Sequence, residues 1–286
     1  MEGCGVVARF APRTGGLWLA MALTLALLPV STRPAGAVLK KLDRDRDRLT
    51  GSVKTVQIEI AKVTSRAGVL QENYRIPWLS MTYDPRGDKI EENQLYSDSH
   101  LNFKSVFAFD AEGLPKEGAE YDHNGTLEFS WVYTVDAAKN RIEENRFYAE
   151  KKGLFSRSTY LYDESGNLIE ETRYHVDSTN DFKWTYRYDA AGNKVEETFF
   201  VVNTKGLSGA GKSVIDSKTI FRYDSKGSLI EETRFDPSGS VRSKKLYTYE
   251  FDQAGNWVKQ IARELAASSG SLPEPTEVTY RVITYY

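Results

Sequence analysis

One pattern recurs seven times along this chain of 286 residues: a hydrophobic residue followed by aspartate, in six copies with glycine three positions after the aspartate. The clearest copies read YDESGNLIEET, YDAAGNKVEET and YDSKGSLIEET. The aspartates lie 26, 26, 27, 26, 35 and 28 residues apart. The units start at Tyr83, Phe109, Val135, Tyr162, Tyr188, Tyr223 and Phe251. Self-similarity at a nearly fixed period predicts one supersecondary unit repeated along the chain.

Each copy has the residues of a hairpin turn. Aspartate at the first position accepts backbone N–H bonds, and glycine takes the positive φ that closes the turn. The turn residues we expect are Asp84, Gly87, Asp163, Gly166, Asp189, Gly192, Asp224, Gly227, Asp252 and Gly255. Aromatic residues alternate before these turns, which indicates strands with one aromatic face. A second turn, such as Asp236 to Gly239, falls about halfway through each unit, so each unit is strand, turn, strand, turn.

Residues 51–286 are therefore expected to form a single all-β domain. Counting turns predicts an antiparallel up-and-down meander of about 16 strands, whereas open twisted sheets rarely exceed ~10 strands without curling. We expect the sheet to curl into a spiral, a partial barrel or a curved sheet, with its aromatic face on the concave or covered side.

The N-terminus has the pattern of a targeting segment. Arg9 and Arg13 precede an apolar run over residues 17–30, and the small residues Ala35, Gly36 and Ala37 follow. This pattern predicts a cleavable secretory signal over residues 1–37, with an uncleaved anchor helix as the alternative. Residues 38–50 contain the alternating charges KKLDRDRDR and are expected to be a solvated tether. We therefore predict a secreted or periplasmic protein of bacterial type, without a membrane span after cleavage.

Composition excludes several function classes. The formal net charge is −2, whereas a nucleic-acid binder needs a concentrated basic face. The single cysteine, Cys4, lies in the predicted signal, so the mature chain has neither a disulfide nor a thiol nucleophile. The three histidines are far apart in sequence and indicate neither a triad nor a metal cluster. We expect no metal, no cofactor and no catalytic constellation.

The motif YDxxGN-[L/K]-[I/V]-E-E-T at ~26-residue spacing resembles the YD repeats of the Rhs family. The resemblance covers residues 80–260 and is closest to small secreted bacterial members. It implies a β-sheet shell and extracellular binding, including binding of carbohydrate. This chain differs from large Rhs proteins because it is short and its repeats continue almost to Tyr286.

One sequence motif is interpreted as a decoy. Gly206, Gly211, Lys212 and Ser213 match the P-loop pattern G-x-x-x-x-G-K-[ST] in full. A P-loop requires a following helix whose N-terminal amides hold the phosphates. Here a β-branched run follows, so we predict an inserted loop and no nucleotide binding.

Two recurrent features remain as candidates for function. Paired glutamates, such as Glu170 and Glu171, recur five times, which favours a structural role as cross-strand partners of arginine or lysine. The aromatic stripe is either core filling or a binding face for sugar rings or another chain. Its residues are Tyr160, Tyr162, Trp184, Tyr186, Tyr188, Phe221, Tyr223, Tyr247 and Tyr249.

The function we expect is that of a non-enzymatic binding or scaffolding module at the cell envelope, with a polysaccharide or another envelope protein as partner. The alternatives are a carbohydrate-active enzyme that uses a glutamate or aspartate lining the curved sheet, and an accessory or remnant of an Rhs-like toxin system.

Overall fold

The computed structural model describes residues 42–66, 69–151, 153–176, 180–203, 212–265 and 275–286. Over these residues the chain forms one short α-helix, one 3₁₀ turn and seventeen strands. In chain order they are α1 (Asp43–Arg46), β1 (Val53–Arg66), β2 (Val69–Glu72), β3 (Ile76–Tyr83), β4 (Lys89–Leu95), β5 (Leu101–Phe109), β6 (Pro115–Asp122), β7 (Leu127–Asp136), η2 (Ala137–Lys139), β8 (Arg141–Tyr148), β9 (Leu154–Tyr162), β10 (Leu168–His175), β11 (Asn180–Tyr188), β12 (Lys194–Asn203), β13 (Lys212–Tyr223), β14 (Leu229–Phe235), β15 (Val241–Phe251), β16 (Trp257–Leu265) and β17 (Pro275–Tyr285).

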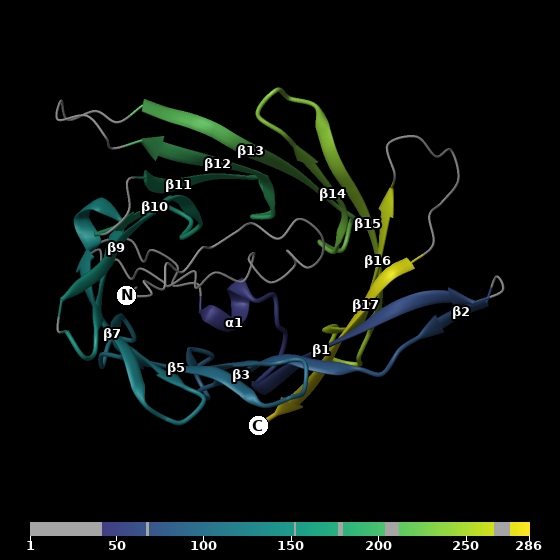
Figure 1. Cartoon of the computed structure of the whole chain (residues 1–286), viewed down its shortest axis with the longest axis horizontal. Helices are drawn as coiled ribbons and strands as arrows, with labels where there is room; N and C mark the ends of the chain where they lie inside the picture. The colour runs from purple at the N-terminus through teal and green to yellow at the C-terminus, as the bar shows by residue number, and fades with distance from the viewer. Residues whose placement is uncertain (1–41, 67–68, 152, 177–179, 204–211, 266–274) are drawn as a thin grey trace, which may run out of the picture.

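The sheet closes on itself into a barrel. Strands β3 to β17 pair antiparallel in sequence order, and β1 joins the two ends because it pairs with both β17 and β3. Val56 of β1 lies opposite Ile283 of β17 on one side and opposite Met81 of β3 on the other. Sixteen strands thus form the ring in Figure 1, and the short β2 extends it as a hairpin with β1.

The all-β antiparallel meander is confirmed, but the expected open spiral, partial barrel or curved sheet is wrong. Closure removes the two sheet edges whose unpaired backbone groups would otherwise face solvent. The strand that achieves it, β1, precedes the repeats and carries none of their signature.

The main turns have the geometry that their residues require. In the turn after β9, the Gly166 amide donates to the Asp163 carbonyl, and the Asp163 carboxylate accepts the amides of Ser165 and Asn167. Each turn glycine has a positive φ, between 75° and 104°. In the third unit Asn140 takes this place with a φ of 48°. All main turns follow odd-numbered strands and therefore lie at one end of the barrel, called here the main-turn end.

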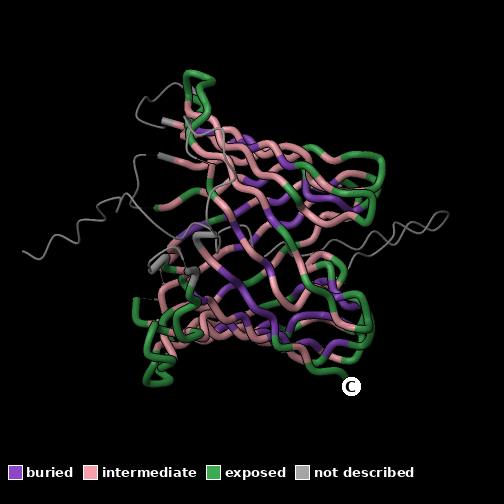
Figure 2. Tube along the Cα trace, turned by 90° about the vertical axis from the view of Figure 1, so that its right-hand side faces the viewer, coloured by how far each residue is buried: buried purple, intermediate pink, exposed green. Residues whose placement is uncertain are grey.

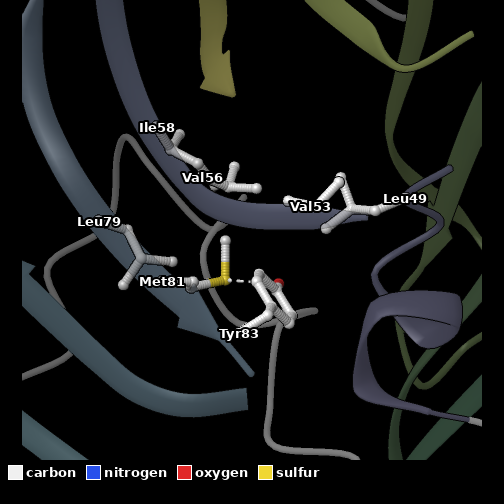
Figure 3. Close-up of a cluster of buried hydrophobic side chains, with 7 residues drawn as sticks. All are labelled: Leu49, Val53, Val56, Ile58, Leu79, Met81 and Tyr83. Carbon is white, nitrogen blue, oxygen red and sulfur yellow. Dashed lines mark hydrogen bonds between the residues drawn. The ribbon is translucent and has the colours of Figure 1, made fainter. Parts of the chain in front are cut away.

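The main hydrophobic cluster lies inside this end of the barrel. Figure 3 shows Val53, Val56 and Ile58 of β1 facing Leu79, Met81 and Tyr83 of β3, with Leu49 beside them. Period-two alternation places Val56 and Ile58, and Leu79, Met81 and Tyr83, on one face of the sheet. Val53 joins them because the register of β1 against β17 shifts between Val53 and Thr55. Their neighbours along each strand are more exposed, which gives the alternating burial in Figure 2.

Residues 42–50, called here the plug segment, enter the barrel at the main-turn end (Figure 1). Asp43 and Leu49 are buried, and the backbone N–H of Arg44 donates to the Gly87 carbonyl at 3.0 Å. The expectation of a solvated tether is therefore wrong for these residues. Their charges find further partners on the barrel wall, where Lys89 forms an ion pair with Asp47 at 3.5 Å. The predicted signal over residues 1–37 lies outside the described residues.

Candidate functional site

The contacts of the plug segment identify which face of the sheet lines the barrel lumen. The Tyr83 hydroxyl donates to the Asp47 carboxylate at 2.5 Å. The guanidinium of Arg46 lies over the ring of Tyr162 at 5.2 Å, and that of Arg48 lies over Tyr223 at 4.6 Å. The tyrosine that precedes each main-turn aspartate in these repeats therefore points into the lumen, as do residues two and four positions earlier in the same strands.

All nine residues of the predicted aromatic stripe lie on this inward face. Tyr160, Tyr162, Phe221 and Tyr247 are buried, whereas Trp184, Tyr186, Tyr188, Tyr223 and Tyr249 are half-buried. Every extensive backbone contact between described elements joins strands that are neighbours in the sheet, so the backbones of opposite walls stay apart. The stripe thus faces the inside of the barrel and not its outer surface.

Three of these tyrosines also connect successive repeats. The hydroxyls of Tyr188, Tyr223 and Tyr249 donate to the main-chain carbonyls of Leu168, Lys194 and Leu229 at 2.8, 2.8 and 2.7 Å. In each case the acceptor begins the returning strand of the preceding repeat, five residues after its aspartate. Tyr188 and Tyr223 are the tyrosines of the motif, whereas Tyr249 lies two positions before Phe251, which takes that place in the last unit. These bonds show a structural role for the three tyrosines, in addition to any contact with a ligand.

The paired glutamates divide between the two faces of the sheet. The first glutamate of each pair points outward and forms an ion pair with lysine or arginine. These pairs are Glu91–Lys104, Glu143–Arg141, Glu170–Lys183, Glu196–Lys218 and Glu231–Lys244, at 2.6 to 2.9 Å. The second glutamate points into the lumen, where its partners are lysine, arginine or tyrosine. Adjacent members of a pair are therefore separated by the sheet and cannot act together on one substrate.

Two inward glutamates from neighbouring repeats are the most deeply buried carboxylates of the lumen wall. Glu144 accepts from the Tyr160 hydroxyl at 3.4 Å. Glu171 forms an ion pair with Arg173 at 2.9 Å and accepts from the Tyr186 hydroxyl at 3.4 Å. Burial raises the pKa of both carboxyl groups above the ordinary value, and the nearby Arg173 guanidinium opposes this shift. Such carboxyls hold a proton at higher pH than exposed glutamates.

A continuous band of rings crosses the inward face of six adjacent strands, β7 to β12. The sequence reasoning identified only Trp184 of this band. It contains Phe129, Tyr148, Phe155, His175, Phe182, Trp184 and Phe199, with neighbouring ring centroids 4.8 to 6.3 Å apart. All seven are half-buried. They lack the spacing of the repeat motif, so only strand alternation around the second turns could have indicated them, and alternation does not place Phe155 inward.

The structure describes only two of the four residues of the decoy motif. Lys212 and Ser213 begin strand β13 and lie opposite Asn203 and Val202 of β12. Gly206 and Gly211 lie outside the described residues. Within the described ranges, no group of three or more His, Cys, Asp or Glu side chains is arranged to hold a metal ion. The same ranges contain no helix with the length and apolar character needed to cross a membrane.

Comparison with models of protein families found no match, and neither did comparison with curated proteins. Among solved structures, a porin-like protein from Bacteroides vulgatus ATCC 8482 is 12% identical, with 83% of this chain and 99% of that chain covered and a TM-score of 0.42. A porin-like protein from Bacteroides uniformis ATCC 8492 is 12% identical, with 82% and 98% covered and a TM-score of 0.35. The TcdB2–TccC3 structure is 16% identical over 77% of this chain and 14% of that chain, with a TM-score of 0.30. These values are too low to carry an argument about function.

Proposed function

We propose that this protein is a non-enzymatic binding module of the bacterial cell envelope, secreted or periplasmic, whose binding surface is the lumen of its barrel. The observation that supports this proposal most is the half-buried aromatic lining on the inward face of a barrel whose opposite walls keep their backbones apart. Aromatic side chains exposed within a concave space are the usual lining of ligand sites, where they offer large apolar contact areas. A module that served only as scaffold would need no such lining.

The outward face supports a barrel surrounded by water. A barrel that faces lipid requires an apolar outer band, and charged residues there are destabilising. Here the outward members of the glutamate pairs form a belt of ion pairs around the wall, including Lys183–Glu170 on β11 and β10 and Lys218–Glu196 on β13 and β12. Each of these glutamates is the third residue of its strand, counted from the main turn, so its ion pair places charge on the outward wall.

The test is a binding screen of the purified protein against envelope polysaccharides, envelope proteins and apolar small molecules. A ligand that enters the lumen should lose affinity in Trp184→Ala and keep it in Thr185→Ala. These two residues are neighbours on β11 whose side chains point to opposite faces. The proposal fails if the whole screen is negative, or if a ligand is found whose affinity Trp184→Ala does not change.

A second candidate function rests on Glu144 and Glu171. Burial raises the pKa of both carboxyl groups, and a carboxyl with a raised pKa can serve as the general acid of glycoside hydrolysis while a second, ionised carboxylate serves as base or nucleophile. A carbohydrate-active enzyme should hydrolyse at least one glycan of a panel, and Glu171→Gln should abolish turnover without changing the urea midpoint. Glu170→Gln is the matched control, because Glu170 points outward on the same strand. Turnover that persists in both Glu144→Gln and Glu171→Gln would exclude this candidate.

A further inference from the structure

The plug segment occupies part of the lumen at its main-turn end. Arg48 of the plug segment donates to the Gly227 carbonyl at 2.6 Å and to the Asn193 side chain at 3.2 Å. Thr50 exchanges hydrogen bonds with the Asn256 side chain at 2.7 and 2.9 Å. Together with the contact between Arg44 and Gly87, these bonds connect the plug segment to four main turns around the barrel. Any ligand of the lumen therefore binds on the wall beyond the plug.

The seven-ring band described above, called here the aromatic band, lies on that part of the wall. Phe129, Phe155 and Phe182 each fall within the first three residues of β7, β9 and β11, whose other ends carry the main turns. The band therefore lies toward the end of the barrel opposite the plug segment. Because neighbouring strands are about 4.8 Å apart, five steps from β7 to β12 give an apolar strip roughly 24 Å long.

The aromatic band contains few polar groups that could bind a ligand. Four of its seven members are phenylalanines, which have no hydrogen-bonding group. Burial and the nearby guanidiniums of Arg173 and Arg146 lower the pKa of His175, so its ring is uncharged at neutral pH. Arg146, which lies over Phe129 at 4.4 Å, already forms an ion pair with Glu120 at 2.6 Å. A ligand of this strip is therefore held by apolar contact.

The orientation of the rings distinguishes between two kinds of apolar contact. A sugar ring stacks on a flat, exposed aromatic face. In the band, Phe199 is stacked against both Phe182 and Trp184, with interplanar angles of 23° and 26°, so these faces cover one another. Phe155 contacts Tyr148 and His175 edge to face, at 70° and 81°. Phe129 is tilted against Tyr148 and Phe155, and Phe182 against Trp184, at 37° to 46°. The rings therefore form no flat platform, which suits a flexible hydrocarbon chain better than a rigid sugar.

From this geometry we propose that the aromatic band binds one long hydrocarbon chain, of the kind carried by a long-chain fatty acid, laid along the wall from β7 to β12. This inference rests on the proposed function and specifies the ligand class for the lumen. The chain runs across the strands, in contact with Phe129 at one end and Phe199 at the other. Its polar end meets water, because the band itself offers no charged partner that is free of an ion pair.

The experiment is a calorimetric titration of the purified full chain with octanoate, decanoate, laurate and palmitate, below their micelle concentrations. Affinity should rise roughly tenfold for every two methylenes added, because each buried methylene contributes about 0.8 kcal/mol. Phe199→Ala should weaken palmitate binding about tenfold or more through lost apolar contact. Phe200→Ala is the matched control. It is the same residue type on the same strand, but it lies opposite Lys183, whose ion pair with Glu170 marks the outward face.

A second pair of variants tests the same inference if Phe199→Ala does not fold. Phe155→Ala removes a ring of the band, whereas Phe147→Ala removes an outward ring next to Tyr148. The inference is overturned if affinity does not depend on chain length, or if the band variants bind palmitate as tightly as their controls. Oligosaccharide binding that Phe199→Ala abolishes, with no palmitate binding, would also overturn it while leaving the lumenal binding function intact. A negative result for every ligand of both screens would remove both proposals.

Discussion

Replacing Asp43 by asparagine should stabilise the protein at neutral pH, although Asp43 lies beside two cations. Its carboxylate is buried under the main turns, and the backbone N–H of Lys89 donates to it at 3.0 Å. Burial raises the pKa of Asp43 to about 6, against an ordinary value of 3.8, and Arg46 and Lys89 only partly oppose this shift. The difference of about two pH units corresponds to about 3 kcal/mol of folding free energy.

The sign of this effect follows from which state binds the proton more tightly. Between pH 6 and 4 the folded chain holds a proton on Asp43 that the unfolded chain releases, so the free energy of unfolding rises as the pH falls through this window. Above pH 6 the charged carboxylate stays buried, and its cost is present in full. Asparagine keeps the oxygen that accepts from Lys89 but carries no charge. Lys89 keeps its ion pairs with Glu92 at 3.0 Å and with Asp47 at 3.5 Å.

Urea unfolding of the wild type and Asp43→Asn at pH 7.5 and pH 4 measures the effect. The variant should be more stable by about 3 kcal/mol at pH 7.5, and the difference should disappear by pH 4. Other buried carboxyls, such as Glu144 and Glu171, titrate in both proteins and cancel in the comparison. A variant that is less stable at pH 7.5, or a difference that is the same at both pH values, would refute the reasoning.

Three further substitutions test the turns, the wall and the plug. Gly227→Ala should destabilise the protein by about 1 kcal/mol or more, because the φ of Gly227 is +81°. Gly153 has no positive φ, so Gly153→Ala should change the urea midpoint little. Equal effects of the two substitutions would contradict the turn geometry. Gly118→Ala would place a Cβ 2.4 Å from the Trp131 indole and should cost about 2 kcal/mol, seen as a lower melting temperature; an unchanged melting temperature would contradict that close packing. Asn256→Ala removes three hydrogen bonds, two of them to the plug segment. Trypsin should therefore cut the arginines of this segment faster than in the wild type. Unchanged cleavage would show that the plug segment does not depend on Asn256.

The local part of the fold could be predicted because its causes are local in sequence. Aspartate and glycine three residues apart determine each main turn, and period two places Tyr186 and Tyr188 on one face. The same alternation correctly separated Glu170 from Glu171. Closure could not be predicted, because β1 pairs with β17 across more than two hundred residues and neither strand carries the repeat signature.

The plug segment and the aromatic band show where sequence reasoning was insufficient. The charges of residues 42–50 read as a solvated tether because their partners, such as Lys89 and the Asn193 side chain, surround them only after the barrel has closed. The band was missed because it is assembled from residues near second turns, which vary in sequence. Phe155 is displaced further by the irregular register at the start of β9, so simple alternation does not place it inward.

Barrel closure is the central claim, since the lumen, the plug and the proposed ligand all depend on it. Thr55 of β1 and Thr284 of β17 are partners across the closing seam, with their hydroxyl oxygens 2.6 Å apart. The test uses a variant that carries Cys4→Ser, Thr55→Cys and Thr284→Cys. Its two new cysteines should form a disulfide in the folded protein on mild oxidation, because the two side chains are close enough for disulfide geometry. Loss of both free thiols, restored by reductant, is the predicted result. Two thiols that stay fully reactive in the folded protein after oxidation would contradict the closed barrel.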